Sequence, residues 1–467
     1  NYFSDKMKTI KDLNGLFNAQ SIAIIGVSRD PNKVGHVIFR SFVDGGYKGN
    51  IFIVNPNAEN ILNYHAYASV SDIPEKVELA IVAVPADVVP KVLEECGKKK
   101  IQNVIVVSAG FKEVGNYKLE KKLEDVIKKY KLRVIGPNAL GVFDAYSKID
   151  SLFLPRFRMS RPKEGIISFV CQSGAVGSSV VDLATAEGYG FAKFISYGNA
   201  VDVDESDLIE YLGTDEKTKV ICLYIEAVKD GKRFLEVCKT VSRKKPIIAI
   251  KGGVTEAGAK ATLSHTGSLA GSAEIYFGAF KQAGVVRAEN LEDMFDFAKI
   301  LEKCIKPKGG NVQIITNGGG YGILAVDAMA KNGVKLAELS PQTKKELRRQ
   351  LPPIINIENP LDLVGDATSG RYKLCIDACM KDKNVDVLLI IVLVQTPLIA
   401  TDIVDILIEA NDLKKKPVVV VSAGGEYTEV MRRNLEQNGI PTYTYPEDAV
   451  RSVQQLVKYY KTNLTAK

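Results

Sequence analysis

Short runs of β-branched residues alternate with longer helical patterns along the chain from residue 21 onward. This alternation is typical of parallel β-sheets whose strands are joined by crossover helices. The sequence therefore predicts an α/β fold. With 467 residues, and roughly 100 to 200 residues per domain, the chain is expected to form about three domains.

The first predicted domain covers residues 1–150 and contains several candidate strands. These are Ser21–Ile25, Asn50–Val54, Leu79–Val84, Asn103–Val107 and Arg133–Ile135. Strands in such close succession form one doubly wound sheet. An irregular, basic segment with Pro155 and Pro162 follows, and it indicates the first domain boundary.

Two further domains are predicted, over residues 164–303 and 311–467, with a linker at Cys304–Gly310 between them. The candidate strands are Ile166–Cys171, Ala192–Ser196, Val220–Ile225 and Pro246–Ile250 in the second domain, and Val312–Thr316, Val385–Val394 and Pro417–Ser422 in the third. Each domain opens with a strand, a glycine turn and a helical pattern. The two domains are therefore interpreted as weakly similar halves.

The composition indicates an ordinary soluble protein, with 46% hydrophobic and 25% charged residues. The net charge of +7 is spread along the chain rather than gathered in a basic arm, so no nucleic-acid partner is expected. Neither a membrane-spanning apolar run nor a signal peptide is found. A cytoplasmic protein without a membrane partner is the expectation.

The cysteines and the other potential metal ligands suggest no special chemistry. Seven cysteines occur without paired C-x-x-C spacing and are interpreted as buried thiols. His, Cys, Asp and Glu residues do not cluster with metal-ligand spacing, so no metal site is predicted.

Three glycine turns between a strand and a helix are candidate phosphate sites, because free backbone N–H groups and the positive helix end meet there. The first is Gly26-Val27-Ser28, followed by Gly35. It departs from the G-x-G-x-x-G spacing, and the next strand ends in Val54-Asn55-Pro56-Asn57 without an acidic residue for a ribose, which disfavours a dehydrogenase. An ordinary tight turn is the alternative interpretation.

The other two turns open the second and third domains. They are Gln172-Ser173-Gly174 and Asn317-Gly318-Gly319-Gly320. The first of these continues with Ala175 and lacks the G-x-S-x-G nucleophile elbow, so a serine hydrolase is not expected.

His265 is the candidate nucleophile. The chain has only three histidines, and this one lies among small residues in Ser264-His265-Thr266-Gly267, where a bulky anion could approach the ring. Neutral imidazole can carry a phosphoryl group when an acceptor orients one ring nitrogen. Glu226, at the end of a predicted strand, is a candidate for that acceptor. An inert histidine and a solvated strand-end glutamate are the alternatives.

Taken together, these motifs resemble the α subunit of archaeal-type ADP-forming acetate–CoA ligase, in the superfamily that includes succinyl-CoA synthetase. The resemblance rests on Leu263–Gly271, Ser173-Gly174, Ser196-Tyr197-Gly198-Asn199 with Asp202, Glu226 and Gly318-Gly319-Gly320. It covers all three predicted domains. It implies a Rossmann-like CoA-binding domain followed by two flavodoxin-like parallel-sheet domains.

The resemblance also implies roles for individual residues. Gly26, Ser28, Lys33 and Gly35 would surround the CoA phosphates, and Asn55, Pro56, Val84, Pro85, Ser108, Ala109, Gly110 and Phe111 would line the rest of the CoA site. Gln172, Ser173 and Gly174 would bind phosphate from one side and Gly318, Gly319 and Gly320 from the other. His265 would be the phosphate carrier and Glu226 its orienter. Asn57 departs from the family, which often has lysine there.

The implied reaction is acyl-CoA + ADP + phosphate ⇌ carboxylate + ATP + CoA, through an acyl phosphate and a phosphohistidine. The ATP-grasp domains of the family have no counterpart in this sequence. The resemblance therefore implies a β subunit that holds the nucleotide and Mg²⁺, in an α2β2 assembly. Acetate is the default acid, and branched or aryl acids remain alternatives.

Two other functions are weighed against this one. A catalytically inactive CoA sensor of the same fold would not need the Ser-His-Thr-Gly segment or both helix turns. A succinyl-CoA synthetase-like ligase would resemble only the first two domains, so the third domain argues against it.

Overall fold

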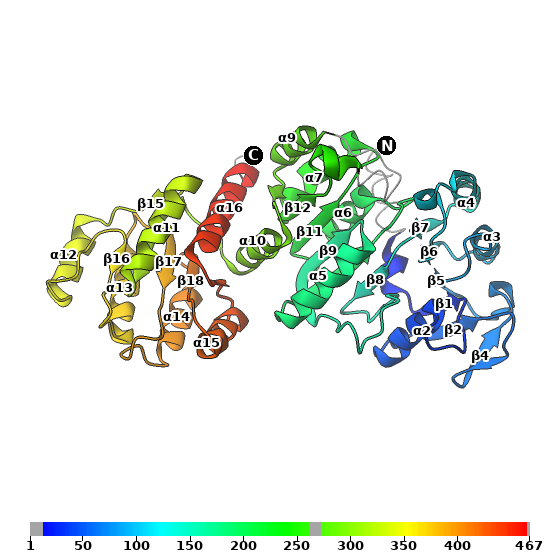
Figure 1. Cartoon of the computed structure of the whole chain (residues 1–467), viewed down its shortest axis with the longest axis horizontal. Coiled ribbons are helices and arrows are strands. Elements are labelled where there is room, and N and C mark those ends of the chain that lie inside the picture. The colour runs from blue at the N-terminus through cyan, green and yellow to red at the C-terminus, as the bar shows by residue number, and fades with distance from the viewer. Residues whose placement is uncertain (1–12, 261–271, 465–467) are drawn as a thin grey trace. The chain divides into compact units, whose positions relative to one another are not determined.

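The computed structural model describes residues 13–260 and 272–464 (Figure 1). The chain divides into two compact units, Asn1–Glu289 and Asn290–Lys467. The first unit holds two β-sheets and the second unit holds one. Among the described residues, no helix is both long and apolar enough to cross a membrane.

The first sheet has the order β3-β4-β2-β1-β5-β6-β7. Its strands are β1 (Ser21–Ile25), β2 (Asn50–Val54), β3 (Asn60–Ile61), β4 (Tyr64–Tyr67), β5 (Leu79–Val82), β6 (Asn103–Val106) and β7 (Arg133–Ile135). All neighbours are parallel except β3 and β4. Without the short β3, this is the strand order of a Rossmann fold, as expected from the sequence.

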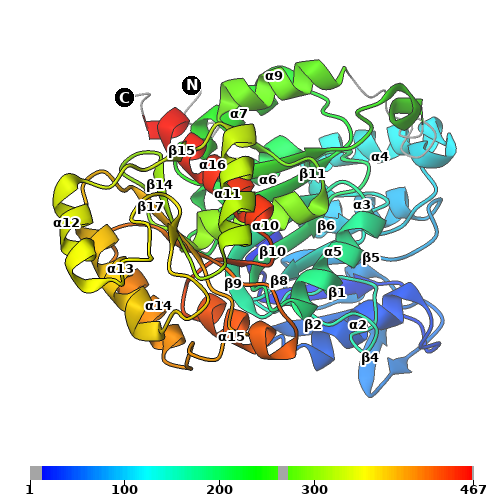
Figure 2. The same ribbon diagram turned by 60° about the vertical axis from the view of Figure 1, so that its left-hand side comes forward.

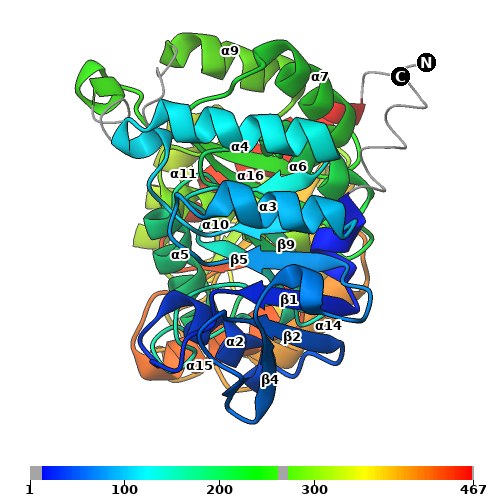
Figure 3. The same cartoon turned by 90° about the vertical axis from the view of Figure 1, so that its right-hand side faces the viewer.

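Successive side chains of the strands point to opposite faces of the sheet and pack into two separate hydrophobic cores. Ile22 and Ile24 of β1 pack with α2 (Val34–Asp44), whereas Ala23 and Ile25 face the core that also contains α3 (Val89–Lys98) and α4 (Tyr117–Tyr130). Figure 3 shows α3 and α4 lying over one face of the sheet. The core on the α2 side continues into the second sheet, which fixes the first two domains against each other.

The second sheet has the order β13-β12-β11-β9-β10-β8. Its strands are β8 (Gly141–Asp144), β9 (Glu164–Cys171), β10 (Phe191–Ser196), β11 (Val220–Ile225), β12 (Ile247–Lys251) and β13 (Val286–Arg287), and its helices are α5 (Gly174–Ala186), α6 (Glu205–Thr214), α7 (Gly231–Ser242) and α9 (Ala273–Ala283). The strands from β9 to β13 follow the flavodoxin order, which confirms the predicted fold class.

Strand β8 lies within residues 1–150, which the sequence assigns to the first domain, yet it pairs antiparallel with β10 of the second sheet. It is short and has no crossover helix, so the alternation of strands and helices does not reveal it.

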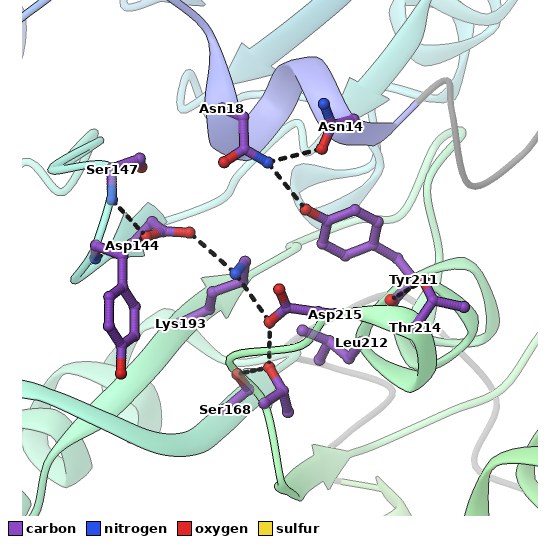
Figure 4. A network of polar contacts seen from close by, with 12 residues as sticks. Asn14, Asn18, Asp144, Ser147, Ser168, Lys193, Tyr211, Leu212, Thr214 and Asp215 are labelled. Atoms are coloured by element: carbon purple, nitrogen blue, oxygen red, sulfur yellow. Dashed lines mark hydrogen bonds and ion pairs between the residues drawn. The ribbon is translucent and has the colours of Figure 1, made fainter.

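A buried ion network holds β8 in place (Figure 4). The ammonium of Lys193 on β10, 3% exposed, lies 3.0 Å from Asp144 of β8 and 2.9 Å from Asp215. Asp215 also accepts a hydrogen bond from Thr218. Burial raises the pKa of Asp215, but the bond from Thr218 and the charge of Lys193 outweigh it and hold this pKa below its usual value.

The third sheet forms the second compact unit, with the order β15-β14-β17-β18-β19 and β16 beside β14. Its strands are β14 (Asn311–Thr316), β15 (Lys335–Leu336), β16 (Leu361–Asp362), β17 (Val387–Ile391), β18 (Val418–Val421) and β19 (Thr442–Tyr443). This is again the flavodoxin order.

The helices of this unit are α10 (Leu291–Lys303), α11 (Gly319–Asn332), α12 (Pro341–Gln350), α13 (Ser369–Lys381), α14 (Ile403–Asp412), α15 (Glu426–Gln437) and α16 (Pro446–Leu464). Helices α11 and α16 pack side by side (Figure 2). Helix α10 lies at the end of residues 164–303, the predicted second domain; it packs against α16 and is grouped with the second compact unit.

Candidate functional site

The turns expected to bind CoA meet at the carboxyl edge of the first sheet. They directly follow β1, β2, β5 and β6. Side chains tie neighbouring turns together: Asn55 Nδ2 donates to the carbonyl of Val27 at 2.7 Å, and Ser108 Oγ donates to the carbonyl of Val84 at 2.6 Å. The structure therefore brings the predicted CoA residues to one edge, where open α/β sheets bind ligands.

Two glycines make the first turn possible. Gly26 has a φ of +98°, a region that favours glycine. A Cβ on Gly35, in the first turn of α2, would lie 2.1 Å from the carbonyl oxygen of Gly26. The helix start therefore packs directly on the turn. Lys33 is the N-cap residue of α2 and is exposed.

His36 is a residue at this edge that the sequence analysis did not select. Its ring is buried, and Nδ1 lies 2.7 Å from the carbonyl oxygen of Ser28. An acceptor at this position requires Nδ1 to carry the proton. His36 thus helps to fix the conformation of the expected phosphate-binding turn.

The second glycine turn joins β9 to α5, which begins at Gly174. Ser173 caps this helix, because its Oγ accepts a hydrogen bond from the backbone N–H of Val176 at 3.3 Å. Gln172 Oε1 accepts hydrogen bonds from the backbone N–H groups of Glu226 at 2.7 Å and Ala227 at 3.1 Å. The ends of β9 and β11 are thereby held together, and the predicted phosphate turn lies beside Glu226.

A cavity of about 360 Å³ opens between this turn and the first domain. It is lined by Val107, Ala109, Lys112, Asn138, Ala139, Leu140, Phe153, Leu154, Gln172, Ser173, Gly174, Ala175, Ser178, Gly198 and Asn199. One wall thus contains the helix start at Gly174, and another contains the loop after β6. A ligand in the cavity would contact both the predicted CoA domain and the predicted phosphate turn.

Lys112 and Asn199, two residues of this lining, are absent from the predicted site. Lys112 Nζ donates to the backbone carbonyl of Asn199 at 2.7 Å, and its side chain is 14% exposed. Burial lowers the pKa of Lys112, as does the charge of Lys229, while Glu120 raises it, and the net shift is downward. The predicted CoA-site motif Ser108-Ala109-Gly110-Phe111 ends one residue before Lys112, so the sequence analysis missed it.

Glu226 is buried at the end of β11, with 5% of its surface exposed. Burial raises the pKa of Tyr224, and the nearby charge of Glu226 raises it further. Burial lowers the pKa of Lys251, although the charge of Glu226 opposes this change. A Cβ on Gly252 would lie 3.4 Å from Cγ of Glu226, so the chain after β12 passes close to this carboxylate.

His265 and the segment around it fall within residues 261–271, outside the described part of the structure. The described residues on either side of this segment are Lys260 and Ser272, and Ser272 immediately precedes α9. The predicted orientation of His265 by Glu226 therefore remains a prediction.

The third glycine turn belongs to the second compact unit. Helix α11 begins at Gly319, with Gly318 as its N-cap residue. Asn317 Oδ1 accepts hydrogen bonds from the Tyr372 hydroxyl at 3.0 Å and from the backbone N–H of Leu393 at 2.8 Å. These bonds hold the turn against the rest of the sheet. A Cβ on Gly320, by contrast, would meet open space.

Asp202, one of the motif residues, has a structural role in this arrangement. Its Oδ2 accepts hydrogen bonds from Arg133 Nε at 3.0 Å and from the backbone N–H of Val134 at 2.8 Å. These bonds join the first sheet to the segment that follows β10.

Three protein families match the chain in succession. They are the CoA binding domain over residues 20–145, the succinyl-CoA ligase like flavodoxin domain over residues 164–301 and the ligase-CoA domain over residues 312–466. The chain is 41% identical to the α subunit of ADP-forming acetate–CoA ligase II from Pyrococcus furiosus, an alignment that covers 96% of this chain and 98% of the relative.

Longer relatives and solved structures agree with this match. The chain is 43% identical to ADP-forming acetate–CoA ligase from Methanocaldococcus jannaschii, but it spans only 62% of the length of that protein. The structure matches that of dinucleotide-forming acetyl-coenzyme A synthetase 1 from Candidatus Korarchaeum cryptofilum in complex with phosphate and ADP. The TM-score is 0.91 at 35% identity, and the match covers 97% of each chain.

The succession of one CoA-binding domain and two flavodoxin-like sheets, with glycine turns that open helices, defines a class of acid–thiol ligases. Within this class the α-subunit relative is matched over nearly its whole length. The chain belongs to the family of ADP-forming acetate–CoA ligases.

Proposed function

We propose that this chain is the α subunit of an ADP-forming acyl-CoA synthetase and that acetyl-CoA is its principal acyl-CoA. The observation that carries the proposal is the cavity of about 360 Å³, because its lining joins the start of α5 to the loop after β6. Phosphate at the helix start and a thioester from the CoA domain would meet there. The α subunits among the relatives support this reading.

In the proposed first step, phosphate binds at Ser173 and Gly174. One phosphate oxygen attacks the thioester carbonyl, the C–S bond breaks, and CoA leaves as the thiol with the proton of the phosphate. The product is an acyl phosphate. The positive end of α5 stabilises the anion by a fraction of a kcal/mol to about 2 kcal/mol.

In the proposed second step, a ring nitrogen of His265 attacks phosphorus, and the carboxylate leaves. Glu226 would orient the ring by accepting a hydrogen bond from its other nitrogen. The helix start at Gly318, Gly319 and Gly320 is proposed as a further phosphate-binding turn. The phosphate then passes to ADP.

We further propose that a β subunit with ATP-grasp domains binds ADP and Mg²⁺ and that the assembly is α2β2. The relative from M. jannaschii is longer than the part that this chain matches, which is 62% of its length. The additional part of that protein is long enough to contain such domains. The seven cysteines of this chain are all buried, which suits structural thiols in the reducing cytoplasm.

The proposal is tested by incubating the chain with acetyl-CoA and radiolabelled phosphate, with and without a candidate β subunit. We expect a protein label that survives base and is lost in acid, as a phosphohistidine would be, and that is absent from His265→Ala. A wild-type chain that stays unlabelled with the partner and a panel of acyl-CoAs would favour an inactive CoA-binding protein instead.

A further inference from the structure

We propose that Lys112 contacts the phosphate directly and supplies the positive side chain of the cavity beside α5. Among the described residues that line this cavity, Lys112 alone is charged. The inference rests on the proposed function, because it takes the cavity as the place where phosphate meets the thioester. It adds a phosphate-binding residue from the CoA domain to the glycine turn of the second domain.

The position of Lys112 is fixed by one contact to the second domain and one within the first domain. Its ammonium donates to the carbonyl of Asn199 at 2.7 Å and lies 3.6 Å from Glu120 Oε1. An ammonium has three N–H donors, so one remains for a ligand in the cavity. Because the side chain is 14% exposed, a bound anion would interact with it in a weakly screened environment.

The nearby carboxylates have donors besides the Lys112 ammonium, and Glu120 also accepts a hydrogen bond from the backbone N–H of Lys112 at 3.3 Å. Glu113 Oε1 accepts hydrogen bonds from the backbone N–H groups of Gly110 and Phe111, at 2.6 and 3.1 Å. Asn199 Nδ2 donates to Glu113 at 2.6 Å and to Glu120 at 2.9 Å. Neither glutamate is part of the cavity lining, whereas Lys112 is. The cavity therefore presents a positive side chain and a positive helix end, which together suit a dianion.

A purely structural role for Lys112 makes a different prediction. Lys229 donates to the carbonyl of Ala200, the residue after Asn199, and Ala200 has a φ of +54°. Lys112 and Lys229 thus hold the same turn by adjacent carbonyls. If Lys112 only holds this turn, replacing either lysine should have the same effect.

The test compares Lys112→Met, Lys112→Arg, Lys229→Met and Lys121→Met in the assembled enzyme. Lys121, on the exposed side of α4, is the matched control. We expect Lys112→Met to raise KM for inorganic phosphate by about 10- to 100-fold, with CoA affinity within about twofold of wild type. Lys112→Arg should recover part of the loss, because it restores the charge, and the other two variants should retain the wild-type KM for phosphate.

An unchanged KM for phosphate in Lys112→Met would overturn the proposal. It would also be overturned if Lys229→Met reproduced the defect, or if CoA affinity fell in parallel. Binding of inorganic phosphate alone, measured by calorimetry on wild type and Lys112→Met, separates this proposal from the proposed reaction. Phosphate binding that depends on Lys112 in a chain without turnover would overturn only the reaction, and turnover without that dependence would overturn only the role of Lys112.

Discussion

At the scale of single residues, the account depends on how Glu226 and Lys112 are held. Glu226 is buried at the end of β11, and its backbone N–H is fixed by Gln172. Lys112 is fixed by the carbonyl of Asn199. The backbone of Glu226 and the side chain of Lys112 are therefore positioned by the fold before any ligand binds, as functional groups in a pre-organised site must be.

The role of Glu226 is tested by Glu226→Gln. Glutamine keeps the shape of the side chain and the backbone bond from Gln172, but it removes the negative charge that would orient an imidazole. We expect phosphorylation of His265 to slow by roughly 10²- to 10⁴-fold. Rapid-quench measurement of the labelled protein gives this rate.

The exposed Glu216, also in the second domain, provides the control variant Glu216→Gln, which should phosphorylate at the wild-type rate. Phosphorylation of Glu226→Gln at that same rate would remove Glu226 from the mechanism.

At the scale of elements, every strand of five or more residues was predicted, whereas several shorter strands, β3 and β8 among them, were missed. The predicted first strand, Ser21–Ile25, has the bounds of β1, because five consecutive buried residues make a clear signal. Strands β3 and β8 have two and four residues, and β8 finds its partner in a sheet whose other strands come later in the chain. Such pairing depends on long-range contacts, which a local pattern does not contain.

The same reason explains what was missed in the candidate site. The glycine turns were found because their chemistry is local. The contact between Lys112 and Asn199 joins residues that are far apart in sequence. His265 was predicted from its small neighbours, and because it lies outside the described residues its role stays a prediction.

The pairing of β8 is tested by Lys193→Met. Removing the ammonium leaves the carboxylates of Asp144 and Asp215 close together without their shared cation. We expect the first compact unit to lose about 3 to 5 kcal/mol of unfolding free energy, measured by denaturant unfolding. The control is Lys121→Met, which breaks an exposed pair with Asp125 far from β8 in the sequence and should cost no more than about 1 kcal/mol. Equal losses in the two variants would contradict a structural role for the buried network.

At the scale of the whole molecule, the chain carries a CoA binding domain and two helix starts that are predicted to bind phosphate, one in each compact unit. The first unit contains the cavity beside α5 and Glu226, and the second contains the turn at Gly318. In the proposed reaction, His265 links the acyl phosphate to a nucleotide on another subunit. The central claim is therefore that one histidine couples thioester cleavage to ATP formation.

The most direct measurement of this claim is ATP formation from acetyl-CoA, ADP and phosphate by the chain with its β subunit. The account predicts ATP and free CoA in equal amounts with wild type, and background ATP formation with His265→Ala while CoA binding is retained. Substantial ATP formation by His265→Ala would contradict it.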